Sequence, residues 1–209
     1  FKGAYDAKPH GLQQHIEVVG LLRHFKYYNS LLNGNHGEGF SATGGGGSVN
    51  GNFEVFKNVH LIANTFFSDG GGRYIFGMAP DLILRPDGNI SLVHTYSTVD
   101  GFEANLSKSL LLYSYYGGAY IGRNAVLDAN GKSQVGYGST GSTNGSQNRS
   151  LQEFTIGMTP TFWKNDRFGA LQLITQYSYV WRNPWYVATG NPKTAKTNMV
   201  FIDLRYTLP

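Results

Sequence analysis

Hydrophobic and polar residues alternate with a period of two along several segments of this chain. Each segment reaches about ten residues, the length that a tilted strand needs to cross a bilayer. The clearest segment is 171–182, where apolar and polar positions separate by parity: Leu171, Leu173, Tyr177, Tyr179 and Trp181 against Gln172, Gln176, Ser178 and Arg182. Because successive side chains of a strand point to opposite faces, this segment predicts a strand with one face suited to lipid and one suited to water.

The same alternation predicts further strands on both sides of this segment. Segments 153–162 and 200–207 repeat it closely, whereas 16–23 and 59–64 mix apolar residues into the polar positions. Together the pattern predicts about eight strands, near 12–27, 46–56, 58–67, 91–105, 109–125, 150–163, 169–184 and 197–208. We therefore expect an all-β protein, a transmembrane antiparallel up-and-down β-barrel that forms a single domain over residues 1–209.

The connections between these strands alternate in length. Short ones fall at Lys57, 106–108 and 164–168. Long ones are rich in Gly, Ser and Asn, which cannot form a core of their own, and they occupy 29–45, 68–89, 127–149 and 188–196. Short turns at one end and long loops at the other are typical of outer-membrane barrels. Aromatic residues near the predicted outer strand ends fit a membrane interface: Tyr27, Tyr28, Trp181, Trp185 and Tyr186.

Composition favours a β protein and excludes several other classes. Charged residues make up 14% of the chain, aromatic residues another 14%, and 28 residues are glycine, which suits neither a helical bundle nor a disordered tail. The net charge of +4 comes from Lys and Arg scattered singly, so we expect no nucleic-acid partner. The absence of cysteine excludes a disulfide framework. A soluble β-sandwich or lipocalin-like cup would show the same alternation and is the alternative fold.

Short motifs follow one another in a fixed order from Gly70 to the end of the chain. They are Gly72-Arg73-Tyr74, Ala79-Pro80-Asp81, Arg85-Pro86-Asp87-Gly88, Leu112-Tyr113-Ser114-Tyr115-Tyr116-Gly117-Gly118, Tyr120, Gly122-Arg123, Val135-Gly136-Tyr137-Gly138, Gln172, Tyr177-Ser178-Tyr179, Asn198-Met199-Val200-Phe201 and Arg205-Tyr206-Thr207-Leu208-Pro209. In this order they resemble the C-terminal portion of a family of porin-like bacterial outer-membrane proteins. Two positions depart from the family pattern, which has an acidic residue at Ala119 and two aromatics where Tyr206 stands alone.

The resemblance implies a barrel larger than these strands alone could form. Members of the family are longer than this chain and carry more strands on the N-terminal side. The resemblance therefore implies that Phe1 lies partway round a larger barrel and that residues 1–209 correspond to its C-terminal half.

The residues predict no catalytic or metal site. The six histidines lie in different segments without the spacing of metal ligands: His10, His15, His24, His36, His60 and His94. The glycine run 44–47, expected in a loop or at a strand end, lacks the Lys-Ser/Thr of a phosphate-binding loop. No nucleophile elbow or dinucleotide fingerprint occurs. We expect neither an enzyme nor a bound cofactor or metal.

Charged residues with inward parity are the candidate pore-lining groups. Arg123, Glu153 and Arg182 are predicted on adjacent strands near the outer half of the lumen, where they would form one network. Such a ladder focuses the field in a pore and selects solutes by charge. The alternative, which the residues favour equally, is a structural network that only neutralises charge inside the barrel. A second predicted cluster lies toward the periplasmic end: Glu103, Asp203 and Arg205.

The turn-rich segment 73–88 is the candidate constriction loop. Its prolines and glycines restrict the backbone, and its charged residues are the candidates for the narrowing: Arg73, Asp81, Arg85 and Asp87. A surface loop ordered by its own turns is the alternative.

The pattern and the resemblance favour a passive pore in the outer membrane of a Gram-negative bacterium. Its expected partners are outer-membrane lipid and small hydrophilic solutes, and assembly of identical chains is left open. Two alternatives remain. One is a structural or adhesive envelope barrel without a channel, because about eight strands enclose an interior just filled by side chains. The other is a soluble extracellular β-sandwich that binds a ligand.

Overall fold

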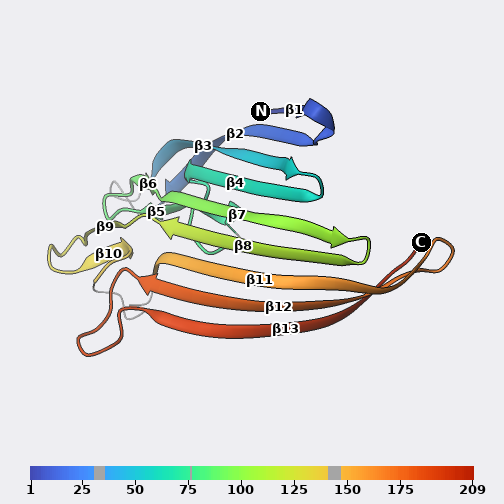
Figure 1. Ribbon diagram of the computed structural model, residues 1–209. Helices are drawn as coiled ribbons and strands as arrows, with labels where there is room; N and C mark the ends of the chain where they lie inside the picture. The colour runs from blue at the N-terminus through green and yellow to red at the C-terminus, as the bar shows by residue number, and fades with distance from the viewer. Residues whose placement is uncertain (31–35, 76, 141–146) are drawn as a thin grey trace.

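The computed structural model describes residues 1–30, 36–75, 77–140 and 147–209 (Figure 1). One large antiparallel sheet dominates it. Its strands, in spatial order, are β1 (Lys2–Ala7), β2 (Gln14–Asn29), β3 (Glu38–Phe56), β4 (Val59–Asp69), β7 (His94–Ser107), β8 (Leu110–Ile121), β11 (Asn148–Asn165), β12 (Gly169–Pro184) and β13 (Ala195–Thr207). Each of these strands pairs with the one before it and the one after it in this order, which follows the chain, so the sheet has up-and-down topology.

The eight strands predicted from periodicity are present as β2, β3, β4, β7, β8, β11, β12 and β13. The strand β1 was not predicted. The glycine run 44–47 belongs to the interior of β3, which begins at Glu38, so the predicted loop 29–45 is shorter than expected. Close approach explains the glycines, since a Cβ on Gly46 would stand 2.4 Å from the carbonyl oxygen of Phe67. Residues 31–35 of that loop, and 141–146 of the loop 127–149, lie outside the described residues.

The prediction that these strands close into a barrel is not met by the described residues. The sheet has nine strands with β1 at one edge and β13 at the other, and it is open. Figure 1 shows these two strands on opposite sides of a curved sheet. Closure requires the tilt, stagger and number of strands to agree. The curvature of this sheet does not bring its two edges together.

The sheet has two chemically different faces, because cross-strand partners lie on the same face. One row runs through Ile156, Tyr177 and Val200, all apolar and all exposed. We call this side the apolar face. Its other large exposed residues have the same parity: Ile16, Val18, Leu22, Val49, Leu61, Phe67, Phe102, Phe154, Met158, Ile202 and Leu204.

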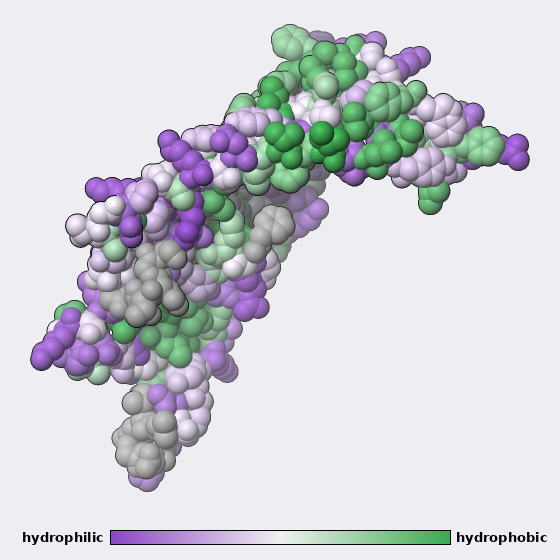
Figure 2. Space-filling model, turned by 90° about the horizontal axis from the view of Figure 1, so that it is seen from below, coloured by the Kyte–Doolittle hydropathy of each residue, from purple (hydrophilic) through white to green (hydrophobic). Residues whose placement is uncertain are grey.

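Figure 2 shows apolar residues gathered over the right-hand arm of the molecule, where Figure 1 places the ends of β11, β12 and β13. No second layer covers the apolar face in the described part of the chain. An exposed apolar surface of this extent is rare on soluble monomers and marks contact with lipid or with another chain. The opposite side, which we call the polar face, carries the inserted segments and the charged residues Arg23, Glu153, Arg182, Asp203 and Arg205.

The long connections at one end of the sheet contain small elements of their own. The connection after β4 holds a 3-10 turn (Gly72–Tyr74) and the hairpin of β5 (Leu82–Leu84) and β6 (Ile90–Leu92). The connection after β8 holds β9 (Asn124–Leu127) and β10 (Gln134–Tyr137). A second 3-10 turn (Pro9–Gly11) links β1 to β2. Across the described residues, no helix is long and apolar enough to span a membrane.

The hydrophobic core lies where these insertions meet the sheet. It is made by Ala79, Val93, Ile121 and Tyr137, with Ile83 and Trp185 packed against it. The indole of Trp185 also donates to the carbonyl oxygen of Ile121 at 2.8 Å. This core fixes the insertion 70–93 to the loop end of the sheet, which positions the site described next.

Candidate functional site

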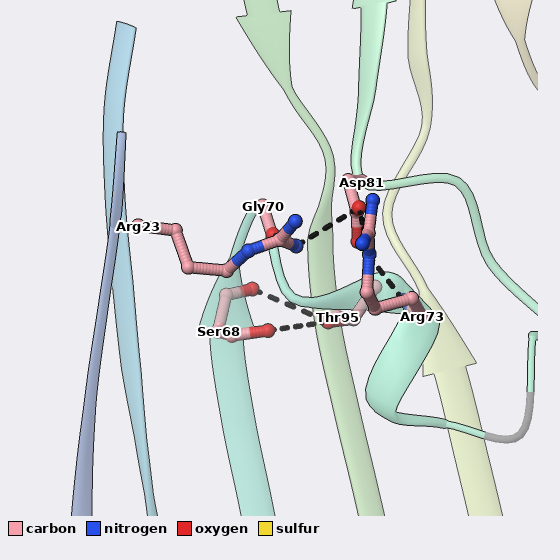
Figure 3. A network of polar contacts seen from close by, with 6 residues as sticks. All are labelled: Arg23, Ser68, Gly70, Arg73, Asp81 and Thr95. Carbon is pink, nitrogen blue, oxygen red and sulfur yellow. Dashed lines mark hydrogen bonds and ion pairs between the residues drawn. The ribbon is translucent and has the colours of Figure 1, made fainter. Parts of the chain in front are cut away.

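Besides the hydrophobic core, the carboxylate of Asp81 attaches the insertion 70–93 to the polar face. Arg23 reaches from β2 across the sheet, and its guanidinium lies 2.9 Å from Asp81 Oδ2 (Figure 3). Arg73 approaches from the insertion itself, with Nε at 2.7 Å from the same oxygen and its backbone N–H donating to Asp81 Oδ1 at 2.9 Å. Arg23 also donates to the carbonyl oxygen of Gly70. A strand and a loop that are distant in sequence are thereby joined.

Two members of the network are largely shielded from water, and the third is exposed. The side chains of Asp81 and Arg23 are 9% and 15% exposed, whereas that of Arg73 is 64% exposed. The Arg23 guanidinium also lies over the rings of Phe25, at 4.5 Å from the centroid, and Tyr74, at 5.6 Å. Two cations share one carboxylate, so the network keeps an excess positive charge that Arg73 presents to solvent.

Burial raises the pKa of Asp81, but hydrogen bonds from the Arg73 backbone and from both guanidinium groups outweigh it. The pKa therefore lies below its ordinary value of 3.8. The carboxyl is charged at neutral and mildly acidic pH. The attachment of the insertion is thus an ion-pair attachment under those conditions.

Two buried hydroxyls hold the sheet together beneath the insertion. Ser68 on β4 and Thr95 on β7 are 2% and 0% exposed, and their hydroxyl oxygens are 2.8 Å apart. Thr95 also donates to the carbonyl oxygen of Ser68. The backbone continues this connection, since Val93 N–H donates to Asp81 and Gly70 N–H donates to Val93. No buried side-chain nitrogen or oxygen in the described residues lacks a hydrogen-bond partner.

A cavity of about 250 Å³ lies between the insertion and the polar face. Tyr74, Ile75 and Met78 line it from the insertion, and Leu151 and Glu153 line it from β11. Its lining is mostly apolar, and Glu153 is the one carboxylate among the described lining residues. The insertion therefore covers part of the polar face and leaves a chemically mixed space under it.

The four candidate constriction residues do not act together. Arg73 and Asp81 belong to the network above. Arg85 instead donates to Ser91 Oγ at 3.1 Å, and the Asp87 carboxylate accepts from Asn89 within its own turn. Arg23 was not predicted as a partner of Asp81, although its polar parity on the predicted strand 12–27 placed it on this face. Ser68 and Thr95 were also missed, because small hydroxyl residues carry no distinctive pattern.

The first predicted charge network is not formed by direct ion pairs. Glu153 and Arg182 both lie on the polar face, opposite Val180 and Leu151 respectively. Glu153 accepts from Thr155 Oγ1 at 3.0 Å, and Arg182 donates to Asn148 Oδ1. Arg123 follows the end of β8 and donates to the Gly138 carbonyl oxygen at 3.1 Å and to Gln134 Oε1 at 2.7 Å. The ion pairs among the described residues do not join Glu153 to either arginine.

The second predicted cluster is split across the sheet. Glu103 lies on β7, where it accepts a hydrogen bond from the Tyr115 hydroxyl. Asp203 and Arg205 lie on the polar face of β13, and β8, β11 and β12 stand between them and β7. Parity correctly predicted that all three side chains lie on one face, but it could not predict how many strands separate them.

Over the described residues, no group of three or more His, Asp or Glu side chains is arranged to hold a metal ion. Two histidines pair with single carboxylates: His15 with Asp6 at 2.7 Å, and His94 with Asp69 at 2.9 Å.

Comparison with known proteins finds a similar fold but no similar sequence. No family model matches the chain, and no curated protein does. The structure is similar to the crystal structure of the outer membrane channel DcaP of Acinetobacter baumannii, with a TM-score of 0.60 and 16% sequence identity. The similarity covers 98% of this chain and 61% of that chain. The fold is therefore porin-like, and this chain spans 61% of the length of the channel it matches.

We expect Asp81→Asn to loosen the insertion on the polar face, although the hydrophobic core still holds it at the loop end of the sheet. Loss of the charge weakens two ion pairs, and a hydrogen bond to a charged group contributes about 1.5–3 kcal/mol. The chain has no cysteine, so Leu84→Cys provides a single site for a spin label on the exposed side of the insertion. The label should become more mobile in the Asp81→Asn background. Asp87→Asn is the matched control, because that carboxylate bonds only within its own turn. Equal mobility in both variants would contradict the attachment.

The same label should report a pH dependence with a defined sign. A carboxyl whose folded pKa is lowered stabilises the folded state above its ordinary pKa, and that stabilisation disappears as the pH falls through the lower folded value. Label mobility should thus stay constant down to the ordinary value of 3.8 and increase only below it. In the Asp81→Asn protein this step should be absent. If label mobility instead changed near neutral pH, a titratable group other than Asp81 would hold the insertion.

Proposed function

We propose that this chain forms part of the wall of a passive outer-membrane pore for small hydrophilic solutes. The observation that carries the proposal is the separation of the sheet into an exposed apolar face and a polar face that holds the insertion. A membrane barrel needs this arrangement, since lipid contacts one face of each strand and water contacts the other. The similar fold of a known outer membrane channel supports it. The location would be the outer membrane of a Gram-negative bacterium.

The two unpaired edges of the sheet indicate further strands in the working pore. Within a bilayer each unpaired backbone N–H or C=O costs several kcal/mol, so an open sheet edge is not stable there. Both β1 and β13 end the sheet in the described residues. A barrel of about sixteen strands leaves an aqueous channel, whereas eight leave none. We therefore assign these nine strands to one side of a larger barrel.

In this proposal the insertion narrows the lumen. It lies over the polar face, attached through Arg23 and Asp81, and it presents the exposed guanidinium of Arg73. Arg123 and Arg182 lie toward the same end of the sheet. A ring of fixed positive charge at a narrow point raises the local concentration of anions. The pore is thus expected to pass anions more readily than cations.

Conductance measurement on the full-length protein tests the proposal. Purified protein should require detergent, migrate as heat-modifiable β structure and give stable ohmic steps in planar lipid bilayers. Folded, membrane-inserted protein that gives no conductance would favour a structural or adhesive barrel instead. Protein that stays monodisperse without detergent would favour the soluble alternative.

Selectivity provides a second test. In Arg123→Gln/Arg182→Gln, the preference for anions in reversal-potential measurements should decrease, because positive potential is lost while Glu153 remains. Lys132→Gln is the control, since Lys132 is exposed in the hairpin connection between β9 and β10 and its charge is screened within about 8–10 Å. If the reversal potential is unchanged while conductance is intact, the two arginines do not select ions and their role is structural.

A further inference from the structure

Two tyrosines of β8 lie flat against the polar face in opposite directions. A Cβ on Gly157 of β11 would stand 2.4 Å from the ring of Tyr113, and a Cβ on Gly101 of β7 would stand 2.4 Å from the ring of Tyr115. Each ring therefore crosses a glycine of a neighbouring strand. The ring centroids are 5.7 Å apart and their planes are tilted by 40°. The two rings form a continuous aromatic surface over β7, β8 and β11.

Hydrogen bonds hold both rings in this orientation. The Tyr113 hydroxyl donates to Gln176 Oε1 at 3.1 Å, and the Tyr115 hydroxyl donates to the Glu103 carboxylate. Gln176 in turn donates to Ser178 Oγ at 3.1 Å. A ring anchored at its hydroxyl and seated on a glycine turns one π face to the sheet and the other to the space above it. A polar rim of carboxylate and amide groups borders that open face.

A polar cavity adjoins the aromatic surface toward the short turns. It has a volume of about 360 Å³, and Leu111, the next residue of the polar face after Tyr113, is part of its wall. The rest of the wall includes the apolar residues Leu110 and Ala170. It also supplies amide, hydroxyl and ammonium groups, among them those of Asn105, Thr159 and Gln172. The polar face therefore carries the aromatic surface and, one position nearer the short turns, a cavity with hydrogen-bonding groups.

The combination fits one class of solute. An aromatic face accepts the C–H groups of a saturated ring, and the rim offers donors and acceptors together, as hydroxyl groups require. Glu103 disfavours an anion beside Tyr115, and the polar rim disfavours a purely apolar molecule. We propose that Tyr113 and Tyr115 form a stacking surface that binds the ring of a neutral carbohydrate inside the pore. This inference rests on the proposed function and names a solute class for it.

Titration calorimetry with maltose on the detergent-solubilised full-length protein tests the inference without requiring conductance. We expect weak saturable binding, on the order of millimolar. Tyr113→Leu/Tyr115→Leu should weaken it about tenfold, because stacked aromatic contacts are lost. Tyr113→Phe/Tyr115→Phe keeps both rings and should retain most of the affinity, which separates stacking from the hydroxyl bonds. Tyr116→Leu, on the apolar face, is the control and should change nothing.

Single-channel recording separates this inference from the pore itself. Maltose should interrupt the current in a saturable way, whereas the acyclic polyol mannitol should not. Ohmic conductance without saturable maltose binding would overturn the carbohydrate site and leave the pore intact. Maltose binding without conductance would support the site and reject the pore. Equal maltose affinity in the wild type and the double Leu variant would overturn the role of the two tyrosines.

Discussion

The register of the hydrogen-bonded ladder is the constraint on which the rest of the structure depends. Side chains alternate between faces, so a slip of one residue in any strand would move its apolar residues to the polar face. The sheet does contain bulges, but they lie close to strand ends, between Glu54 and Phe56, between Asn105 and Ser107, between Thr161 and Trp163, and between Asn148 and Ser150. The middle of each strand therefore keeps its parity, and the two faces stay distinct.

Parity also determines which groups can meet above the sheet. Arg23 points to the polar face because it alternates with apolar residues such as Leu22, and only on that face can it reach Asp81. The aromatic surface of Tyr113 and Tyr115 shares this face but lies nearer the short turns. The polar face thus carries an arginine-rich region at its loop end and an aromatic, polar region toward its other end. A solute crossing the proposed pore would meet the two in succession.

Much of the fold could be predicted because it is encoded locally. The eight long strands and the common face of Glu153, Arg182, Asp203 and Arg205 follow from period-two alternation, which each strand carries in its own residues. Lateral relations could not be predicted in this way. The separation of Glu103 from Arg205 depends on strand order, and the contact of Arg23 with Asp81 depends on how an insertion folds back. Periodicity alone did not show that the sheet is open, since curvature is a property of the whole sheet, whereas the family resemblance did imply a larger barrel. The short strand β1 was missed because its six residues carry little apolar alternation.

The edge strand β13 constrains the strand that would pair with it in the proposed pore. Its apolar side continues the apolar face with Val200, Ile202 and Leu204, and its polar side presents Phe201, Asp203 and Arg205. A strand that pairs with this edge must place its apolar residues on the apolar face and its polar residues on the polar face. Otherwise its polar residues would face lipid, at a cost of a few kcal/mol for each charge. Its polar residues would then lie directly beside Asp203 and Arg205. The charge of the completed lumen is therefore shared between this sheet and the strands that pair with its edges.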